Sequence, residues 1–186
     1  FESYRGLAVA LVNQDRPGDA LPCAENAVKF SPDDPVSHVV RAHALLRLNR
    51  VDEAIASATR AIEIRPREVG AYEVRAWGRR LQKRDDLARS DYNAALDLRP
   101  ANPEMLVRLA DVDSSLGETV EATIALGFFM ELVKDRHEYI VLWCPQLRNA
   151  GMPERALPAL EAAEAVGKKQ RDWPWADRDI TAETKK

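Results

Sequence analysis

Small and apolar residues return to the same positions along this chain with a period of about 34 residues. Three columns hold almost only small residues, and a fourth column holds proline. A period of this length is typical of repeat proteins, in which each repeat is one unit of a few elements stacked on its neighbours. The columns are Ala20, Ala54, Ala88, Ala122 and Ala156; Ala27, Ala61, Ala95, Phe129 and Ala163; Ala8, Ala42, Ala76, Ala110 and Cys144; and Pro32, Pro66 and Pro100.

The columns predict two antiparallel helices in each unit. Two helices can approach closely only where the facing positions lack bulk, and their large neighbours then interdigitate. In the first unit we expect helices over residues 3–13 and 19–30, and later units repeat them one period further on. Each proline of the fourth column ends a second helix, because the residue before a proline is pushed out of the helical region. Pro17 and Pro22 are expected in the first turn of a second helix, where a missing N–H costs little.

The residues in these columns resemble the tetratricopeptide repeat. The third unit keeps most of the pattern, whereas the second has His38 at a usually aromatic position, and Arg41 and Arg75 stand where the family has leucine. We expect these arginine stems to be half-buried. Gly117 and Gly151 fall at the turn between the two helices of a unit. The matching residues are Tyr4, Leu7, Ala8, Leu11, Ala20, Ala24, Ala27 and Pro32; Ala42, Leu45, Ala54, Ala58, Ala61 and Pro66; and Tyr72, Ala76, Ala88, Tyr92, Ala95 and Pro100.

The resemblance covers residues 1 to about 168 and implies an all-α fold. It implies a right-handed α-solenoid of five antiparallel helix pairs with a capping segment at the C-terminal end. The alternative for that last segment, centred on Trp173-Pro174-Trp175, is a free ligand motif. The expected units are 1–34, 35–68, 69–102, 103–136 and 137–170, the last two degenerate, followed by a cap or tail over 171–186.

Composition and charge exclude several classes of function. The formal net charge of −3 is too close to neutral to favour nucleic acid or anionic lipid as a partner. No run reaches the roughly 18 apolar residues of a membrane span. The first residue is Phe1 and not Met, which favours a fragment or a processed product. Cys23 and Cys144 show no metal-ligand spacing, so we expect free thiols, a reducing compartment and a cytoplasmic location.

No constellation of residues predicts catalysis. The chain has no glycine loop for phosphate, no paired-histidine zinc motif and no nucleophile elbow. His38 and His43 are five residues apart on one helix, which places them on different faces, and His137 stands alone. We therefore expect a protein that is not an enzyme and holds no cofactor and no metal.

The resemblance also implies where a partner binds, because first helices line the concave face in this family. Val39, Val40 and Val74 are then apolar residues on an outward face, which favours an interaction site. The alternative is that the curvature of the solenoid buries them. The expected groove residues are Arg5, Val9, Asn13, Val39, Val40, His43, Arg47, Glu73, Val74, Trp77, Arg80, Val107, Arg108 and Asp111.

His43 and Trp77 occupy the same position of adjacent units, so we expect them side by side at the centre of the groove. The alternative is that Trp77 packs sideways against Val40 and Val74 and stiffens the array. A tryptophan buried on binding is the residue type most often found as an interface hot spot.

One subset of the family grips the C-terminal tails of chaperones with Lys and Asn side chains. Arg5 matches the first cationic position, but Val9, Val40, Gly70 and Val74 replace the other four. This argues against a chaperone tail and predicts a less anionic ligand.

These observations favour a scaffold or adaptor that binds a peptide or a helix of another protein in its groove. A second hypothesis makes the array the regulatory or substrate-recruiting arm of a larger enzyme with its catalytic domain outside these residues. A third is pure self-association through the end units.

Overall fold

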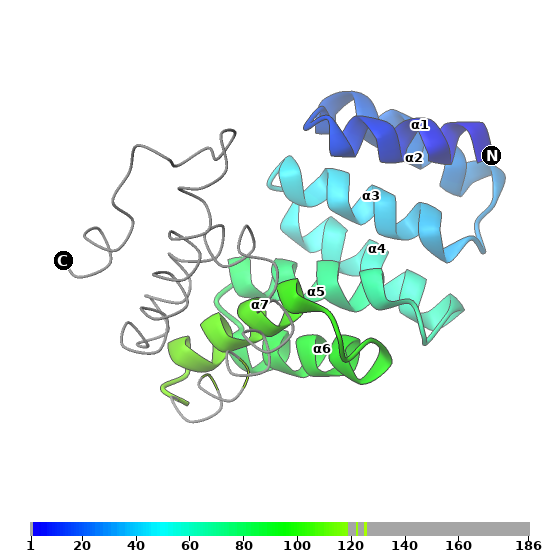
Figure 1. Cartoon of the computed structure of the whole chain (residues 1–186). Coiled ribbons are helices and arrows are strands. Elements are labelled where there is room, and N and C mark those ends of the chain that lie inside the picture. Colours follow the sequence, from blue (N-terminus) through cyan, green and yellow to red (C-terminus); the bar gives the residue numbers. More distant parts are fainter. Residues whose placement is uncertain (1, 119–121, 123–124, 126–186) are drawn as a thin grey trace, which may run out of the picture. The chain divides into compact units, whose positions relative to one another are not determined.

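The computed structural model describes residues 2–118, 122 and 125, and this part of the chain contains helices and no strand (Figure 1). The chain divides into two units, Phe1–Pro100 and Ala101–Lys186, and each is taken by itself below. The helices of the first unit are α1 (Glu2–Asn13), α2 (Pro17–Phe30), α3 (Pro35–Arg47), α4 (Val51–Ile64), α5 (Val69–Leu81) and α6 (Asp85–Leu98), and that of the second is α7 (Pro103–Ser115).

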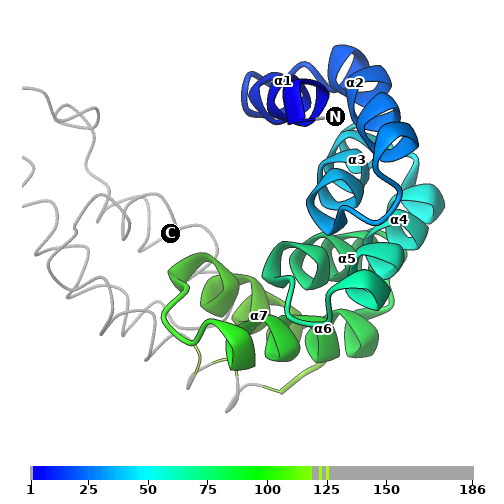
Figure 2. The same cartoon turned by 90° about the vertical axis from the view of Figure 1, so that its right-hand side faces the viewer.

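The first unit is a stack of three helical hairpins (Figures 1 and 2). Each first helix packs against the second helix that follows it, as α1 on α2, α3 on α4 and α5 on α6. The second helix of one hairpin packs against the first helix of the next, as α2 on α3 and α4 on α5. First helices also meet one another, α1 with α3 and α3 with α5. The all-α helical repeat predicted from the periodic columns is confirmed.

The helix ends recur at the predicted interval. The second helices end at Phe30, Ile64 and Leu98, each two residues before a proline of the fourth column. Pro17 starts α2 as expected, whereas Pro22 lies in the second turn, so its placement in the first turn was wrong. A helix interior normally penalises proline because the ring removes one N–H bond and crowds the preceding turn.

The turn inside each hairpin has a left-handed residue at the same position. Asp15, Asn49 and Lys83 have φ angles of 55°, 60° and 58°, and Gly117 after α7 has a φ of 81°. In each case the next residue donates its N–H to a carbonyl five residues back, as Arg84 does to Arg79 at 2.9 Å. This Schellman arrangement satisfies carbonyls at the end of the first helix. The prediction for Gly117 is confirmed, while the three other residues carried no glycine signal.

The alanine columns form the contacts between helices. All the column alanines among the described residues have no exposed surface, so a larger side chain at any of them would have to displace a neighbour. Gly78 of α5 is equally close-packed, because a Cβ atom built there would lie 2.7 Å from Cγ1 of Ile55 on α4. The predicted close approach of the helices is therefore confirmed in the part of the chain that the structure describes. The alanines are Ala8, Ala42, Ala76, Ala110, Ala20, Ala54, Ala88, Ala122, Ala27, Ala61 and Ala95.

Several expectations lie outside the described residues. They concern most of the second helix of the fourth unit, the fifth unit over 137–170 with Gly151, and the cap over 171–186.

Candidate functional site

A hollow of about 620 Å³ lies on the surface between α1 and α3. Its floor is apolar, because Val40 is only 6% exposed and Val12 is half-buried, while Val9 is 37% exposed at its edge. Polar side chains stand around this floor. The residues that line it are Val9, Val12 and Asn13 of α1, Asp15 of the following turn, and Val40, His43 and Arg47 of α3.

Arg47 closes one side of the hollow and connects three hairpins. Its Nη1 lies 2.8 Å from Oδ1 of Asp15, and its guanidinium carbon lies 5.8 Å from the ring centroid of Trp77 on α5. Both side chains of this ion pair are exposed to solvent, so the pair contributes little to stability. A guanidinium at this distance from an indole adds about 0.5–1 kcal/mol at an exposed site. The arrangement holds the Arg47 side chain along the rim, with its charge balanced by Asp15.

Near the start of α1, Arg5 is held by a carboxylate that caps α3. Arg5 Nη1 donates to both carboxylate oxygens of Asp34, at 3.2 and 3.1 Å, and Asp34 accepts from the backbone N–H of Ser37 at 3.0 Å. Burial alone would raise the pKa of Asp34. Hydrogen bonds from the Ser37 hydroxyl, from Arg5 and from the Ser37 N–H outweigh it and lower the pKa below its ordinary value. Asp34 therefore stays ionised and holds Arg5 against α3.

Five of the predicted groove residues come together in the hollow. They are Val9, Asn13, Val40, His43 and Arg47. The sequence did not single out Val12 and Asp15, which complete the lining. Val12 lies three residues after Val9 on the same helix, and this spacing was an available signal.

The valines expected on an outward face are buried, and that expectation was wrong. Val39, Val40 and Val74 are 8%, 6% and 0% exposed. The cause is the close packing of first helices on one another: a Cβ atom at Gly70 of α5 would lie 3.3 Å from Cγ1 of Val39 on α3. The alternative interpretation, burial by neighbouring helices, holds for Val39 and Val74. Of the three valines, only Val40 lines the hollow.

The remaining predicted residues lie on α5 and α7. Glu73, Trp77 and Arg80 are half-buried on α5, and Trp77 packs against the core cluster that contains Val39 and Val74. Trp77 is not among the residues that line the hollow, and the guanidinium of Arg47, which does line it, lies over the Trp77 ring.

Of the three residues on α7, in the second unit, Val107 is 1% exposed, Asp111 is half-buried and Arg108 pairs with Glu104 at 2.6 Å.

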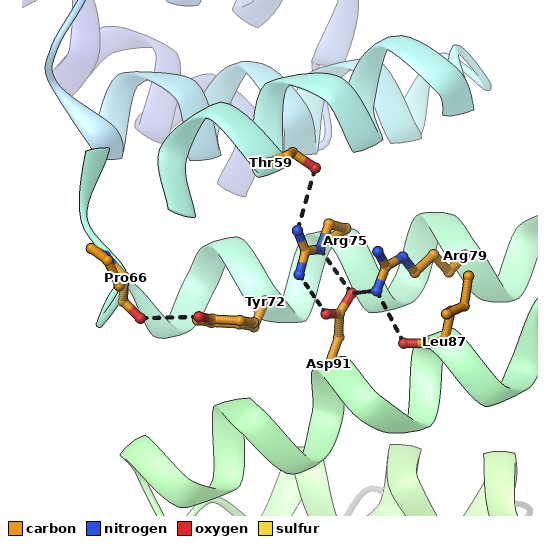
Figure 3. A network of polar contacts seen from close by, with 7 residues as sticks. All are labelled: Thr59, Pro66, Tyr72, Arg75, Arg79, Leu87 and Asp91. Atoms are coloured by element: carbon orange, nitrogen blue, oxygen red, sulfur yellow. Dashed lines mark hydrogen bonds and ion pairs between the residues drawn. The ribbon is translucent and has the colours of Figure 1, made fainter. Parts of the chain in front are cut away.

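A second polar cluster, which the sequence did not predict, joins α4, α5 and α6 (Figure 3). The carboxylate of Asp91 is 3% exposed and accepts from Arg75 at 3.0 and 2.8 Å and from Arg79 at 2.7 Å. Burial lowers the pKa of Arg79, although the Asp91 charge acts in the opposite direction. Removing one partner of such a pair leaves a buried charge uncompensated and is strongly destabilising. We assign this cluster to the packing of the third hairpin.

The described residues contain no group of three or more His, Cys, Asp or Glu side chains that could hold a metal ion. No helix within the same residues is long and apolar enough to cross a membrane.

Comparison with known proteins places the fold in a family. The profile of the tetratricopeptide repeat matches residues 5–69 and 39–103, more than half of the chain. The chain therefore belongs to the tetratricopeptide repeat family, a fold that generally serves as a non-catalytic module for protein–protein interaction. No curated protein matches the sequence.

Solved structures of similar fold agree with this assignment. A thermophilic tetratricopeptide protein of Thermus thermophilus, TTC0263, has a TM-score of 0.74 at 23% identity, and the match covers 98% of this chain and 97% of that protein. MamA from Desulfovibrio magneticus RS-1 has a TM-score of 0.72 at 15% identity, over 92% and 97%. The first repeat domain of Spaghetti (RPAP3), solved with the HSP90 peptide SRMEEVD, has a TM-score of 0.59 at 23% identity, over 62% and 91%. These likenesses show the fold.

Proposed function

We propose that this protein is an interaction scaffold or adaptor that binds a peptide or a helix of another protein in the groove formed by its first helices. The observation that carries the proposal is the hollow between α1 and α3, which combines an apolar floor with polar groups at its edge. Binding sites commonly pair an apolar pocket with a few polar groups that fix orientation.

The shape and chemistry of the hollow favour an apolar side chain as the anchor of the ligand. Val9, Val12 and Val40 offer only apolar surface to it. The amide of Asn13 and the imidazole of His43 can then donate to or accept from the ligand backbone beside the anchor. Arg47 lies over the Trp77 ring on α5, and we therefore propose Trp77, Glu73 and Arg80 as an extension of the binding groove beyond the hollow.

The charges around the hollow argue against a strongly anionic ligand. Arg47 is paired with Asp15, and Arg5 is paired with Asp34, so a ligand carboxylate would have to displace an existing partner. The RPAP3 domain of similar fold was solved with an acidic peptide, SRMEEVD. In this chain, valine at Val9, Val40 and Val74 removes the polar side chains expected of a carboxylate clamp. We therefore propose a ligand that is less anionic than a chaperone tail.

The proposal is tested by selecting a ligand and then damaging the hollow. A random peptide library is panned on the immobilised chain, and the dissociation constants of enriched peptides are measured by fluorescence anisotropy. Val9→Asp places a charge at the edge of the apolar floor, and we expect it to weaken binding by about tenfold or more, the size of losing one buried anchor contact.

Leu48→Asp is the matched control, because Leu48 is 38% exposed against 37% for Val9 and does not line the hollow. Peptides that bind wild type and Val9→Asp equally well, or that lose the same affinity with Leu48→Asp, would contradict the proposed site.

A further inference from the structure

Two rows of side chains that line the hollow continue from α3 onto α5. Each row holds one residue of α1 and one of α3 at the same repeat position, and all four of these residues line the hollow. Since α3 packs against both α1 and α5, the equivalent positions of α5 extend the same surface (Figure 2). These positions hold Trp77 and Leu81, which we call the α5 ledge. The two rows are Val9, His43 and Trp77, and Asn13, Arg47 and Leu81.

The α5 ledge is apolar and partly open to solvent. Its two residues are four apart on one helix and are therefore neighbours on the same side of α5. Leu81 is 49% exposed and Trp77 is half-buried. In contrast, Val39 and Val74 are only 8% and 0% exposed, because the first helices pack closely on one another. The same packing leaves Leu81 uncovered, and exposed apolar surface that adjoins a binding site favours contact with the ligand.

Arg47 lies between the hollow and the α5 ledge. It lines the hollow, and its guanidinium carbon lies 5.8 Å from the centroid of the Trp77 ring. Among the described residues, its guanidinium donates a hydrogen bond only from Nη1, to Asp15 at 2.8 Å. An arginine has five N–H donors, and the amide of Asn13 beside it can both donate and accept. Two apolar patches are thus separated by polar groups that can bind a peptide backbone.

This arrangement favours an extended ligand over a helical one. The backbone N–H and C=O groups of an extended segment need partners, whereas a helix pairs most of its own. An extended segment that crosses from the hollow to the α5 ledge would offer carbonyls to Arg47 and both kinds of group to Asn13. The charge of Arg47 is already balanced by Asp15, so the crossing segment needs no charge of its own.

We propose that the α5 ledge is a second anchoring site of the groove, and that the ligand is an extended peptide segment with two apolar side chains four residues apart. One side chain occupies the hollow and the other lies on Trp77 and Leu81. This inference rests on the proposed function, because the hollow must take the first side chain.

The spacing of four residues follows from the geometry of the stack. Packed helices lie about 8–10 Å apart, and the hollow is between α1 and α3, so α5 is about one and a half spacings away, or about 12–15 Å. An extended chain advances about 3.3 Å per residue and points every second side chain to the same side. Four residues therefore span about 13 Å, whereas two residues are too short and six are too long. Two turns of a helix, with side chains seven residues apart, span only about 10.5 Å.

Peptides selected on the immobilised 186-residue chain from a random library test the proposal. We expect the enriched peptides to share two apolar residues four positions apart. Each of the two is replaced by alanine in turn, and dissociation constants are measured by fluorescence anisotropy on wild type, Val9→Asp and Leu81→Ser. Alanine at one position should weaken binding to wild type by about fivefold, the size of one partly buried leucine contact, and should cause no further loss on Leu81→Ser. Alanine at the other position should show the same coupling to Val9→Asp.

Leu48→Ser is the matched control. Leu48 is 38% exposed, and its equivalent in the third hairpin, Gln82, donates to Asp52 of α4, so this position faces the second helices and not the groove. Leu48→Ser should bind the selected peptides as wild type does. Circular dichroism of each variant confirms that it is folded as wild type.

The variants separate a failure of the α5 ledge from a failure of the whole groove. Binding that is weakened by Val9→Asp but unchanged by Leu81→Ser would overturn the second anchoring site and leave the hollow in place. Binding that neither variant weakens, or a library from which no peptide is enriched, would contradict the proposed function and this inference with it. Enriched peptides whose apolar residues are seven positions apart would overturn the extended ligand and favour a helix.

Discussion

His38 and Tyr72 make the same hydrogen bond in consecutive hairpins. Nε2 of His38 lies 2.8 Å from the carbonyl oxygen of Pro32, and the hydroxyl of Tyr72 lies 3.1 Å from the carbonyl oxygen of Pro66. Both proline carbonyls belong to the loop that connects two hairpins, six residues before the side chain. His38 thus takes the role of the aromatic residue that it replaces in the repeat, with Nε2 as the donor.

This relationship predicts the effect of two substitutions at His38. His38→Phe removes the donor and leaves the Pro32 carbonyl without it, so the free energy of unfolding should fall by about 1 kcal/mol. His38→Tyr restores a donor as found at Tyr72 and should lose less. Urea denaturation measures both, and an equal loss in the two variants would show that the hydrogen bond is not what holds the loop.

The left-handed turn residues predict a stabilising substitution. Lys83 has a φ of 58°, a conformation that costs a residue with a Cβ atom roughly 1–2 kcal/mol. Lys83→Gly should raise the free energy of unfolding by about 1 kcal/mol, because part of this gain is lost to the greater freedom of glycine in the unfolded chain. Lys83→Ala keeps the Cβ atom and should give no such gain. Thermal unfolding of the two variants compares them, and equal melting temperatures would refute the assignment.

The lowered pKa of Asp34 predicts that the protein loses stability in acid. Its pKa is lowered in the folded state below the ordinary value of 3.8, so the carboxylate stabilises the fold above that pH. The contribution disappears as the pH falls from 3.8 through the lower folded pKa. Asp34→Asn should therefore be less stable than wild type at pH 7, and the difference should shrink below pH 3.8.

Denaturant midpoints at a series of pH values measure this difference. Asp19→Asn is the control, since Asp19 has a 58% exposed side chain and makes an exposed ion pair with Arg16. A difference between wild type and Asp34→Asn that stays constant with pH would contradict the account of Asp34.

The packing of Trp77 predicts that its truncation lowers the stability of the protein, whether or not it also affects binding. Its ring packs on the core cluster and lies against Arg47, and it is half-buried. Trp77→Ala should lower the free energy of unfolding by about 2 kcal/mol, less than the loss typical of a fully buried aromatic residue. Trp77→Phe keeps the packing and should retain most of the stability. A Trp77→Ala variant that melts as wild type but no longer binds a selected peptide would instead make Trp77 a contact residue.

The repeat columns could be predicted because one packing rule acts at the same position of each hairpin. The burial of Ala54 and Ala88 can be predicted without knowing the curvature of the stack, since any larger side chain there would meet the facing helix. The faces of the first helices could not be predicted in the same way. Whether Val39 and Val74 face solvent depends on how tightly α1, α3 and α5 stack, and this distance is a property of the whole unit.

The turns and the polar cluster had weaker signals in the sequence. Gly117 indicated the turn after α7, whereas Lys83 at the equivalent position gave no such sign of the turn after α5. Asp91 and Arg75 lie on different helices of one hairpin, several turns apart along the chain, and no local pattern pairs them. The hollow contains residues of both kinds. Val9 and His43 could be predicted from the register of the repeats, whereas Asp15 belongs to a turn whose conformation the sequence did not indicate.

The most direct test of the proposed binding groove is an NMR spectrum of the valine methyl groups with and without a peptide selected on the chain. The hollow predicts that the methyl signals of Val9, Val12 and Val40 shift on titration, while those of Val51 at the start of α4 stay in place. Shifts that avoid Val9, Val12 and Val40, or that appear only at α4, would contradict binding between α1 and α3.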